Sequence, residues 1–166
     1  HEPARRGRAD RRLVPVRSPV HVDDRRAREH LRAGRGAPVV DAAIDVARLV
    51  KNPFEDDCSF DFEGFGKVVD VSVRMLDNVL DVTPWPLSQQ KKEAANKRRV
   101  GLGYTGLGDA LLMLQLAYDT DEARAMGARI TEYMRDRAYE ASVELARERG
   151  AFPLFNADLY LSGGNF

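Results

Sequence analysis

Apolar residues recur every three or four positions along two long stretches of the chain, a spacing that places them on one face of an α-helix. The first stretch predicts a helix over about residues 60–82, with apolar positions at Phe62, Phe65, Val69, Val73, Leu76 and Leu80. The second predicts a helix over residues 121–149, with Asp119 or Thr120 as its N-cap and Gly150 just past its end. Its expected buried positions are Met126, Ile130, Tyr133, Met134, Ala138, Ala141 and Leu145.

Polar residues and prolines mark the limits of the first helix. Residues 83–86, Thr-Pro-Trp-Pro, must end it, because proline cannot continue the helical hydrogen bonds. Trp85, between the two prolines, is expected to be a packing anchor. Candidate N-caps ahead of the helix are Asp56, Asp57 and Ser59. On or near its solvent-facing side we expect Asp70, Arg74 and Asp77.

Shorter elements fill the rest of the patterned region. Residues 39–50 predict a short strand or turn that leads into one helical turn, and residues 88–98 predict a short charged helix. Residues 99–103 predict a short strand, and a helix over about residues 105–116 follows it. Together these patterns predict a mainly α-helical chain with one or two short β-strands.

Residues 1–36 differ in composition from the rest of the chain. They hold 11 Arg and five acidic residues, contain no Phe, Tyr, Trp or Lys, and are interrupted by three prolines. Such a segment buries too little apolar area to offset its chain entropy, so we expect disorder or a weak helix around residues 23–33. A basic arm for nucleic acid is the alternative, although no aromatic residue is interleaved for base stacking. We therefore divide the chain into an atypical Arg-rich leader, residues 1–38, and a folded part, residues 39–166.

The totals limit the classes of protein that remain. A chain of 166 residues suits one domain with a modest core, and its 26 basic and 26 acidic residues balance, so no global charge favours DNA or a membrane. The single cysteine, Cys58, excludes an internal disulfide and a multi-cysteine metal site. No apolar run approaches the roughly 18 residues of a membrane span, and no apolar segment typical of a signal peptide follows the Arg-rich start. We expect a cytoplasmic protein.

Three glycines form a candidate cofactor loop. Gly101, Gly103 and Gly106 match the dinucleotide-binding pattern G-x-G-x-x-G letter for letter. That site needs a buried strand before the glycines and a second strand that ends in an acidic residue about 20 positions later. Here the preceding residues 97–99 are Lys-Arg-Arg, and the acids at that distance open a helix. A dinucleotide-binding domain is therefore the less favoured interpretation, and close approach of a strand and a helix is the favoured one.

Other residues that carry chemistry show no supporting pattern. Asp77 and Asp81 lie four positions apart and could present two carboxylates to a metal, but no His or Glu lies nearby to complete the ligand set, so capping and surface roles are expected. Cys58 follows three acidic residues that disfavour its reactive thiolate, so we interpret it as a loop residue. The spacing of the three histidines does not suggest a set of metal ligands; they are His1, His21 and His30. We assign no catalytic, cofactor-binding or metal-binding residue.

A series of short motifs occurs in a fixed order over residues 44–160. The segments are Ile44–Val50, Arg74–Val82, Pro86-Leu87 with Gln89-Gln90, Arg98–Gly103 with Gly106-Leu107 and Asp109-Ala110, and Leu145-Ala146 with Gly150–Pro153. In this order they resemble the large, catalytic subunit of ribonucleotide reductase. Residues 78–83, 89–90 and 152–155 are most similar to the adenosylcobalamin-dependent, class II branch, with the di-iron-dependent, class I branch as the alternative.

The resemblance implies that the chain is a fragment of a ten-stranded α/β barrel that reduces ribonucleotides to deoxyribonucleotides for DNA replication. In that family a cysteine on a finger loop becomes a thiyl radical and abstracts the ribose 3′ hydrogen, and a pair of cysteines supplies the electrons. The implied activity is that of a thioredoxin-linked ribonucleoside-diphosphate reductase. Adenosylcobalamin is the implied cofactor, and the implied partners are a ribonucleotide, a thioredoxin-type reductant and the remainder of the barrel.

The chain also departs from the family pattern. The family's Asn-x-Cys-x-Glu motif is expected ahead of Ile44, yet residues 1–38 contain no cysteine, and Val39 stands where a redox cysteine is expected. We therefore expect the chain to be inactive alone. One hypothesis is that residues 1–38 are translated out of frame from GC-rich DNA, and a divergent leader is the alternative. A second function, from another class, is a small helical interaction module that uses residues 121–149 or the basic arm.

Overall fold

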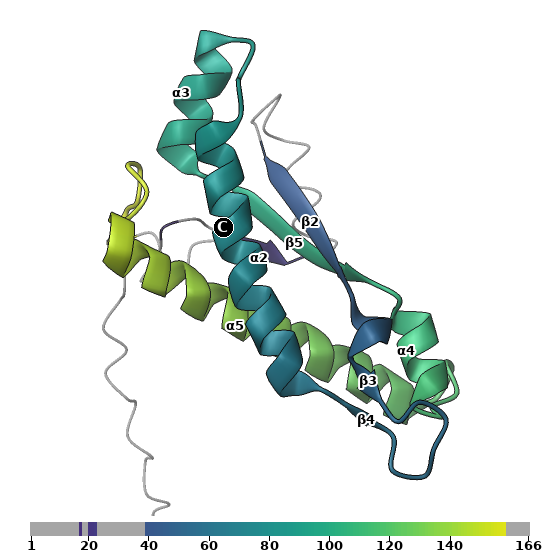
Figure 1. Ribbon diagram of the computed structural model, residues 1–166. Coiled ribbons are helices and arrows are strands. Elements are labelled where there is room, and N and C mark those ends of the chain that lie inside the picture. Colours follow the sequence, from purple (N-terminus) through teal and green to yellow (C-terminus); the bar gives the residue numbers. More distant parts are fainter. Residues whose placement is uncertain (1–16, 18–19, 23–38, 159–166) are drawn as a thin grey trace, which may run out of the picture.

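The computed structural model describes residues 17, 20–22 and 39–158 (Figure 1). In chain order its elements are β1 (Val20–Val22), β2 (Val40–Asp45), the 3₁₀ helix η1 (Val46–Leu49), β3 (Val50–Lys51), β4 (Ser59–Phe60), α2 (Phe62–Val82), α3 (Ser88–Lys97), β5 (Val100–Thr105), α4 (Leu107–Met113) and α5 (Asp121–Arg149). One sheet has the strand order β1-β5-β2, and β3 and β4 form a separate antiparallel pair.

β5 is the central strand of the three-stranded sheet, and both of its neighbours run parallel to it. Val100 lies in register with Val20 of β1 on one side and with Val40 of β2 on the other. The connection from β2 to β5 passes through α2 and α3 (Figure 1). Neighbouring parallel strands require such a crossover, because a tight turn cannot join them.

The sheet has one buried face and one open face. Val100 and Leu102 of β5 and Ile44 of β2 are buried on the first face, where α2 and α5 pack against them and form a single apolar core. Successive residues of a strand point to opposite sides, so Gly101 and Gly103 lie on the second face. On that face Asp41, Ala43 and Asp45 of β2 are exposed to solvent.

α2 begins at an acidic cap and ends before a proline. The Asp61 side chain accepts a hydrogen bond from the backbone N–H of Gly64 at 2.9 Å, which makes Asp61 the N-cap. The helix ends at Val82, ahead of Pro84. The expected caps Asp56, Asp57 and Ser59 were wrong, because the short strand β4 intervenes between that segment and the helix.

α5 matches its expected limits and crosses α2 (Figure 1). Thr120 is its N-cap, and Gly150 ends it with a φ of 84°. At the crossing, a Cβ on Gly66 would lie 2.9 Å from the Tyr133 hydroxyl oxygen, so the glycine allows the two helices to approach closely. The buried residues of α5 are Ala123, Ile130, Met134, Ala138, Ser142, Leu145 and Ala146. Of the other expected core positions, Met126, Tyr133 and Ala141 are only partly buried.

The sequence expectations are confirmed for most elements. The fold is mainly helical, and α2, α3, β5 and α5 lie where the patterns predict them, whereas α4 has only seven residues. The described residues form five strands, more than the one or two expected, and β1 lies in the Arg-rich leader. The weak helix expected around residues 23–33 falls outside the described residues. Within the described residues, no helix is both long enough and apolar enough to cross a membrane.

Candidate functional site

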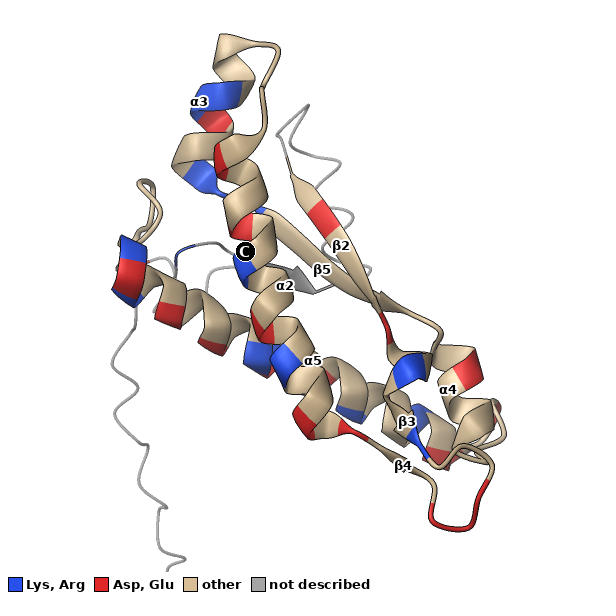
Figure 2. Cartoon of the chain, in the orientation of Figure 1, with Lys and Arg blue, Asp and Glu red and all other residues tan. Residues whose placement is uncertain are grey.

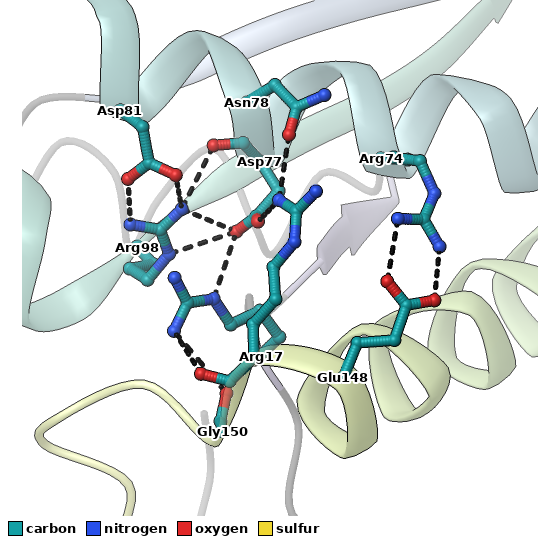
Figure 3. A network of polar contacts seen from close by, with 9 residues as sticks. Arg17, Arg74, Asp77, Asn78, Asp81, Arg98, Glu148 and Gly150 are labelled. Atoms are coloured by element: carbon teal, nitrogen blue, oxygen red, sulfur yellow. Dashed lines mark hydrogen bonds and ion pairs between the residues drawn. The ribbon is translucent and has the colours of Figure 1, made fainter.

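A buried ion pair joins α2 to the start of β5. Arg98 ends α3 and Asp77 lies in α2, and their side chains are 4% and 0% exposed. The Arg98 guanidinium donates from Nε and Nη2 to Oδ1 of Asp77, at 2.9 and 2.7 Å, and from Nη2 to the Asp77 carbonyl oxygen at 2.9 Å (Figure 3). Such a planar donor pair holds a carboxylate more firmly than a single bond does.

A second carboxylate, one helical turn further along α2, binds the same guanidinium. Arg98 donates from Nη1 to Oδ1 of Asp81 at 2.7 Å and from Nη2 to Oδ2 at 3.1 Å. The carboxylates of Asp77 and Asp81, four residues apart in α2, therefore face an arginine and not a metal ion. Within the described residues no group of three or more His, Cys, Asp or Glu could hold a metal.

The other oxygen of Asp77 binds the end of α5. Arg149 donates from Nη1 to Oδ2 of Asp77 at 2.8 Å and to the side-chain oxygen of Asn78 at 2.7 Å. Arg17, from the leader, lies 3.6 Å from Oδ1 of Asp77 and donates to the carbonyl oxygens of Arg149 and Gly150, at 3.2 and 3.4 Å (Figure 3). One buried carboxylate thus connects α2, α3, α5 and the leader.

Electrostatics make this cluster a structural clamp. Burial opposes the charge of Arg98, but its hydrogen bonds to Asp81 and Asp77 outweigh that effect and raise the pKa of the guanidinium above its ordinary value. An arginine held in its charged form does not exchange protons at neutral pH, so it is a poor acid–base catalyst. The arrangement can fix the angle between helices and strand, and we assign it that role.

Asp77 corrects an expectation drawn from the sequence. It was placed on or near the solvent-facing side of its helix, with a capping or surface role, but its side chain is fully buried. Asp77 lies four residues after Val73 and three before Leu80, which are both core residues, so its position belongs to the buried stripe. That spacing indicated that Asp77 would be buried. No pattern in the sequence indicated that its partner would be Arg98, 21 residues away.

The glycine motif does not form a phosphate-binding loop. Gly101 and Gly103 lie within β5, and Gly106 alone occupies the turn before α4. A Cβ on Gly101 would lie 2.1 Å from Oδ1 of Asp41, so the glycine makes room for that side chain on the neighbouring strand. A fingerprint loop needs its glycines in the turn, where backbone N–H groups face the phosphates. The dinucleotide interpretation therefore loses its geometric basis.

The open face of β2 and β5 carries small and acidic residues. It combines Gly101 and Gly103 with Ala43, Asp41 and Asp45. Neither aspartate was predicted as a site residue, although each directly follows an apolar strand residue, Val40 or Ile44, that points to the other face. A sheet face without bulky side chains allows another chain segment or a ligand to approach the backbone closely.

Cys58 lies apart from this face. It follows the acidic loop between β3 and β4, visible in Figure 2, and its sulfur is 4.0 Å from the side-chain nitrogen of Gln115. His1 and His30 fall outside the described residues, and only the backbone of His21 is described. The interpretation of Cys58 as a loop residue is confirmed.

Comparison with known proteins identifies the family. The family model described as "Ribonucleotide reductase, barrel domain" matches residues 42–166. The vitamin B12-dependent ribonucleoside-diphosphate reductase of Mycobacterium tuberculosis is 34% identical over 122 residues, which are 74% of this chain and 17% of that protein. A reductase with the same name from Thermoplasma acidophilum is 36% identical over 98 residues, 59% of this chain and 13% of that protein.

A relative without the vitamin B12 designation matches equally well. The ribonucleoside-diphosphate reductase large chain of Encephalitozoon cuniculi is 37% identical over 114 residues, 69% of this chain and 15% of that protein. The chain thus spans less than a fifth of the length of these relatives, and the match lies within one domain of them. The chain belongs to the large-subunit family of ribonucleotide reductases and corresponds to part of their barrel domain.

Proposed function

We propose that residues 39–166 form part of the catalytic barrel of an enzyme that reduces ribonucleotides to deoxyribonucleotides for DNA synthesis in the cytoplasm. The observation that carries this proposal is the family match over residues 42–166, which begins in β2. The parallel β2–α2–β5 unit, with its helices on one face, is the building block of an α/β barrel. In such a barrel the helices lie outside, so the open face of β2 and β5 would face the interior.

The contribution of this segment to the reaction is positional. The open face supplies small side chains, which leave space near the backbone, and the Asp77–Arg98 clamp fixes β5 against α2. The thiyl-radical step and the reducing dithiol both need cysteines, and the sequence has only Cys58, which lies in the loop after β3. The catalytic cysteines would therefore come from other parts of the parent enzyme, with electrons from a thioredoxin-type reductant.

Adenosylcobalamin is the proposed cofactor of the parent enzyme, since two of the relatives carry vitamin B12 dependence in their names. The described residues identify no site for this group. The groove of about 410 Å³ between α2 and α5 lies on the helix side of the sheet, away from the open face of β2 and β5 that would line the barrel interior. We therefore assign no residue of this chain to the cofactor and derive no step through it.

A segment exchange tests the proposed function. In the M. tuberculosis reductase, the segment aligned with residues 42–166 is replaced by those residues of this chain. We expect the chimaera to form deoxyribonucleotides from ribonucleoside diphosphates with adenosylcobalamin and a thioredoxin system, whereas the 166-residue chain alone should not. A chimaera that folds and binds the cofactor but gives no product would overturn the proposal.

The same exchange in a second host tests the cofactor branch. The E. cuniculi large chain serves as the matched host, because its identity to this chain is similar. We expect higher retained activity, relative to each unmodified host, in the vitamin B12-dependent protein. Equal retention in both hosts would support the barrel assignment and remove the preference for the adenosylcobalamin branch.

The division at residue 38 stays a prediction. The family match begins at residue 42 and β2 at Val40, which supports a boundary close to that point. However, β1 and Arg17 of the leader contact the folded part. Sequencing of the coding DNA separates the two origins of the leader: an intact reading frame through residues 1–38 contradicts the out-of-frame hypothesis, and a shifted frame supports it.

A further inference from the structure

β5 has a short strand of the leader on one edge and a full-length strand on the other. β1 pairs with residues 100–102 of β5, whereas β2 pairs with all six of its residues. Within the part of the chain that the structure describes, residues 103–105 therefore have no strand partner on the β1 side. An uncovered edge presents backbone N–H and C=O groups that can pair with another strand. Half of this edge of β5 is thus still open to a strand.

Arg17, three residues ahead of β1, ties the leader to the end of α5. Its backbone N–H donates to the carbonyl oxygen of Ser142 at 3.1 Å, and its guanidinium donates to those of Arg149 and Gly150 at 3.2 and 3.4 Å. Carbonyl groups at the C-terminal end of a helix carry partial negative charge and favour a cation. The Arg17 side chain is 16% exposed, and its Nε lies 3.6 Å from Oδ1 of Asp77 (Figure 3). These contacts hold β1 at a defined place beside β5.

This edge strand comes from outside the region that matches the family. The match begins at residue 42, so it includes most of β2 and all of β5 but not β1. In a closed barrel every strand has a neighbour on each side, because closure leaves no free edge. A complete barrel would therefore place one of its own strands on the edge of β5 that faces away from β2. That strand would need the place that β1 holds in this chain.

We propose that β1 is a substitute edge strand, which covers β5 in this chain and gives way to a barrel strand when the complete barrel forms. The proposal rests on the barrel assignment made above. The short pairing of β1 suits this role, because an element held by few backbone hydrogen bonds opens at low cost. A covered edge is also protected from pairing with other chains. The role holds for either origin of the leader, since it depends on backbone pairing and on Arg17.

Hydrogen exchange of the intact 166-residue chain, followed by mass spectrometry, tests the covering role. Arg17→Ala removes the side-chain tie to α5, and we expect residues 100–102 to exchange at least tenfold faster, with a smaller change in α2. Arg147→Ala is the matched control, because it removes an arginine near the same end of α5 that pairs with Glu144 at the surface. It should change the exchange of residues 100–102 less than twofold. Equal acceleration in both variants, an equal increase throughout α2 and β5, or no change in Arg17→Ala would overturn the proposal.

The M. tuberculosis chimaera tests the replacement of β1 by a barrel strand. It carries residues 42–166 without the leader, so we expect residues 103–105 to exchange at least tenfold more slowly in the chimaera than in the 166-residue chain. Exchange at the same rate in both proteins would overturn the proposal. The activity of the chimaera is measured separately. Slow exchange without activity would contradict the proposed function alone, and activity with fast exchange would contradict the role of β1 alone.

Discussion

Arg98 and Asp77, 21 residues apart in the chain, share two hydrogen bonds to one carboxylate oxygen inside the protein. Arg98 also has a left-handed backbone, with φ of 44° and ψ of 45°, which is costly for a residue with a side chain. The ion pair holds the chain in that conformation at the point where α3 turns into β5. Arg98 thus belongs to a sequence motif, has a strained backbone conformation and carries a buried charge.

Removal of Arg98 should destabilise the fold strongly. Arg98→Ala leaves Asp77 buried with part of its charge uncompensated, and we expect a loss of about 3–5 kcal/mol in the free energy of unfolding, measured by urea denaturation. Asp81→Ala is the matched control: Asp81 binds the same guanidinium, but its side chain is 49% exposed, so the loss should stay below about 1 kcal/mol. Equal losses in the two variants would contradict the clamp.

Gly106 and Gly108 should respond to alanine in opposite directions. Gly106 has a φ of +75°, and a Cβ there would lie 2.5 Å from Oδ1 of Asp45, so Gly106→Ala should cost about 1–3 kcal/mol. Gly108 lies in α4, and a Cβ added there would meet open space, so Gly108→Ala should stabilise the protein by about 0.5–1 kcal/mol. Thermal unfolding of both variants measures the difference, and a shift of the same sign in both would refute it.

The two long helices were predictable because local periodicity determines them. Asp77 was misplaced because an acidic residue was assumed to face solvent, although its spacing from Val73 and Leu80 placed it in the buried stripe. The three arginines that bind Asp77 come from residues 17, 98 and 149, and no local pattern connects them. β1 was missed because its pairing with β5 lies in a segment of polar, Arg-rich composition. Long-range charge pairing and strand partners depend on the fold as a whole.

The N-cap of α2 should make stability depend on pH. The hydrogen bond from the Gly64 N–H, and then that from Lys51, lower the pKa of Asp61 below its ordinary value. A carboxylate with a lowered pKa in the folded state stabilises the protein above its unfolded pKa, and this contribution is lost as the pH falls through the folded value. Asp61→Asn keeps a capping side chain but does not titrate, so its stability should fall less steeply below about pH 5.

The N-cap of α5 provides the control for that titration. Thr120 accepts a hydrogen bond from Ala123 N–H at 3.3 Å but carries no charge. Thr120→Ala should therefore lower the stability by about 1 kcal/mol at every pH. Urea denaturation at several acidic pH values gives the free energy of unfolding of each variant as a function of pH. If this dependence were the same for Asp61→Asn as for the unmodified chain, the proposed role of the carboxylate would be excluded.

A hydroxyl pair should couple β5 to α5. The hydroxyl oxygens of Tyr104 and Thr131 lie 2.8 Å apart, and Thr131 donates to the carbonyl oxygen of Gly127 at 2.9 Å, so Tyr104 is the donor to Thr131. Tyr104→Phe removes this bond with little change of volume and should cost about 1 kcal/mol. Because Thr131→Ala removes the same bond, the losses should not add in the double variant, with a coupling of about 0.5–1.5 kcal/mol.

Tyr118→Phe is the control for the hydroxyl pair. Tyr118 is 74% exposed, so loss of its hydroxyl should change the stability by less than about 0.5 kcal/mol. Urea denaturation of the two single variants, the double variant and this control gives the coupling energy directly. Additive losses at Tyr104 and Thr131 would show that the two hydroxyls act independently, and that the packing of apolar side chains alone holds β5 against α5.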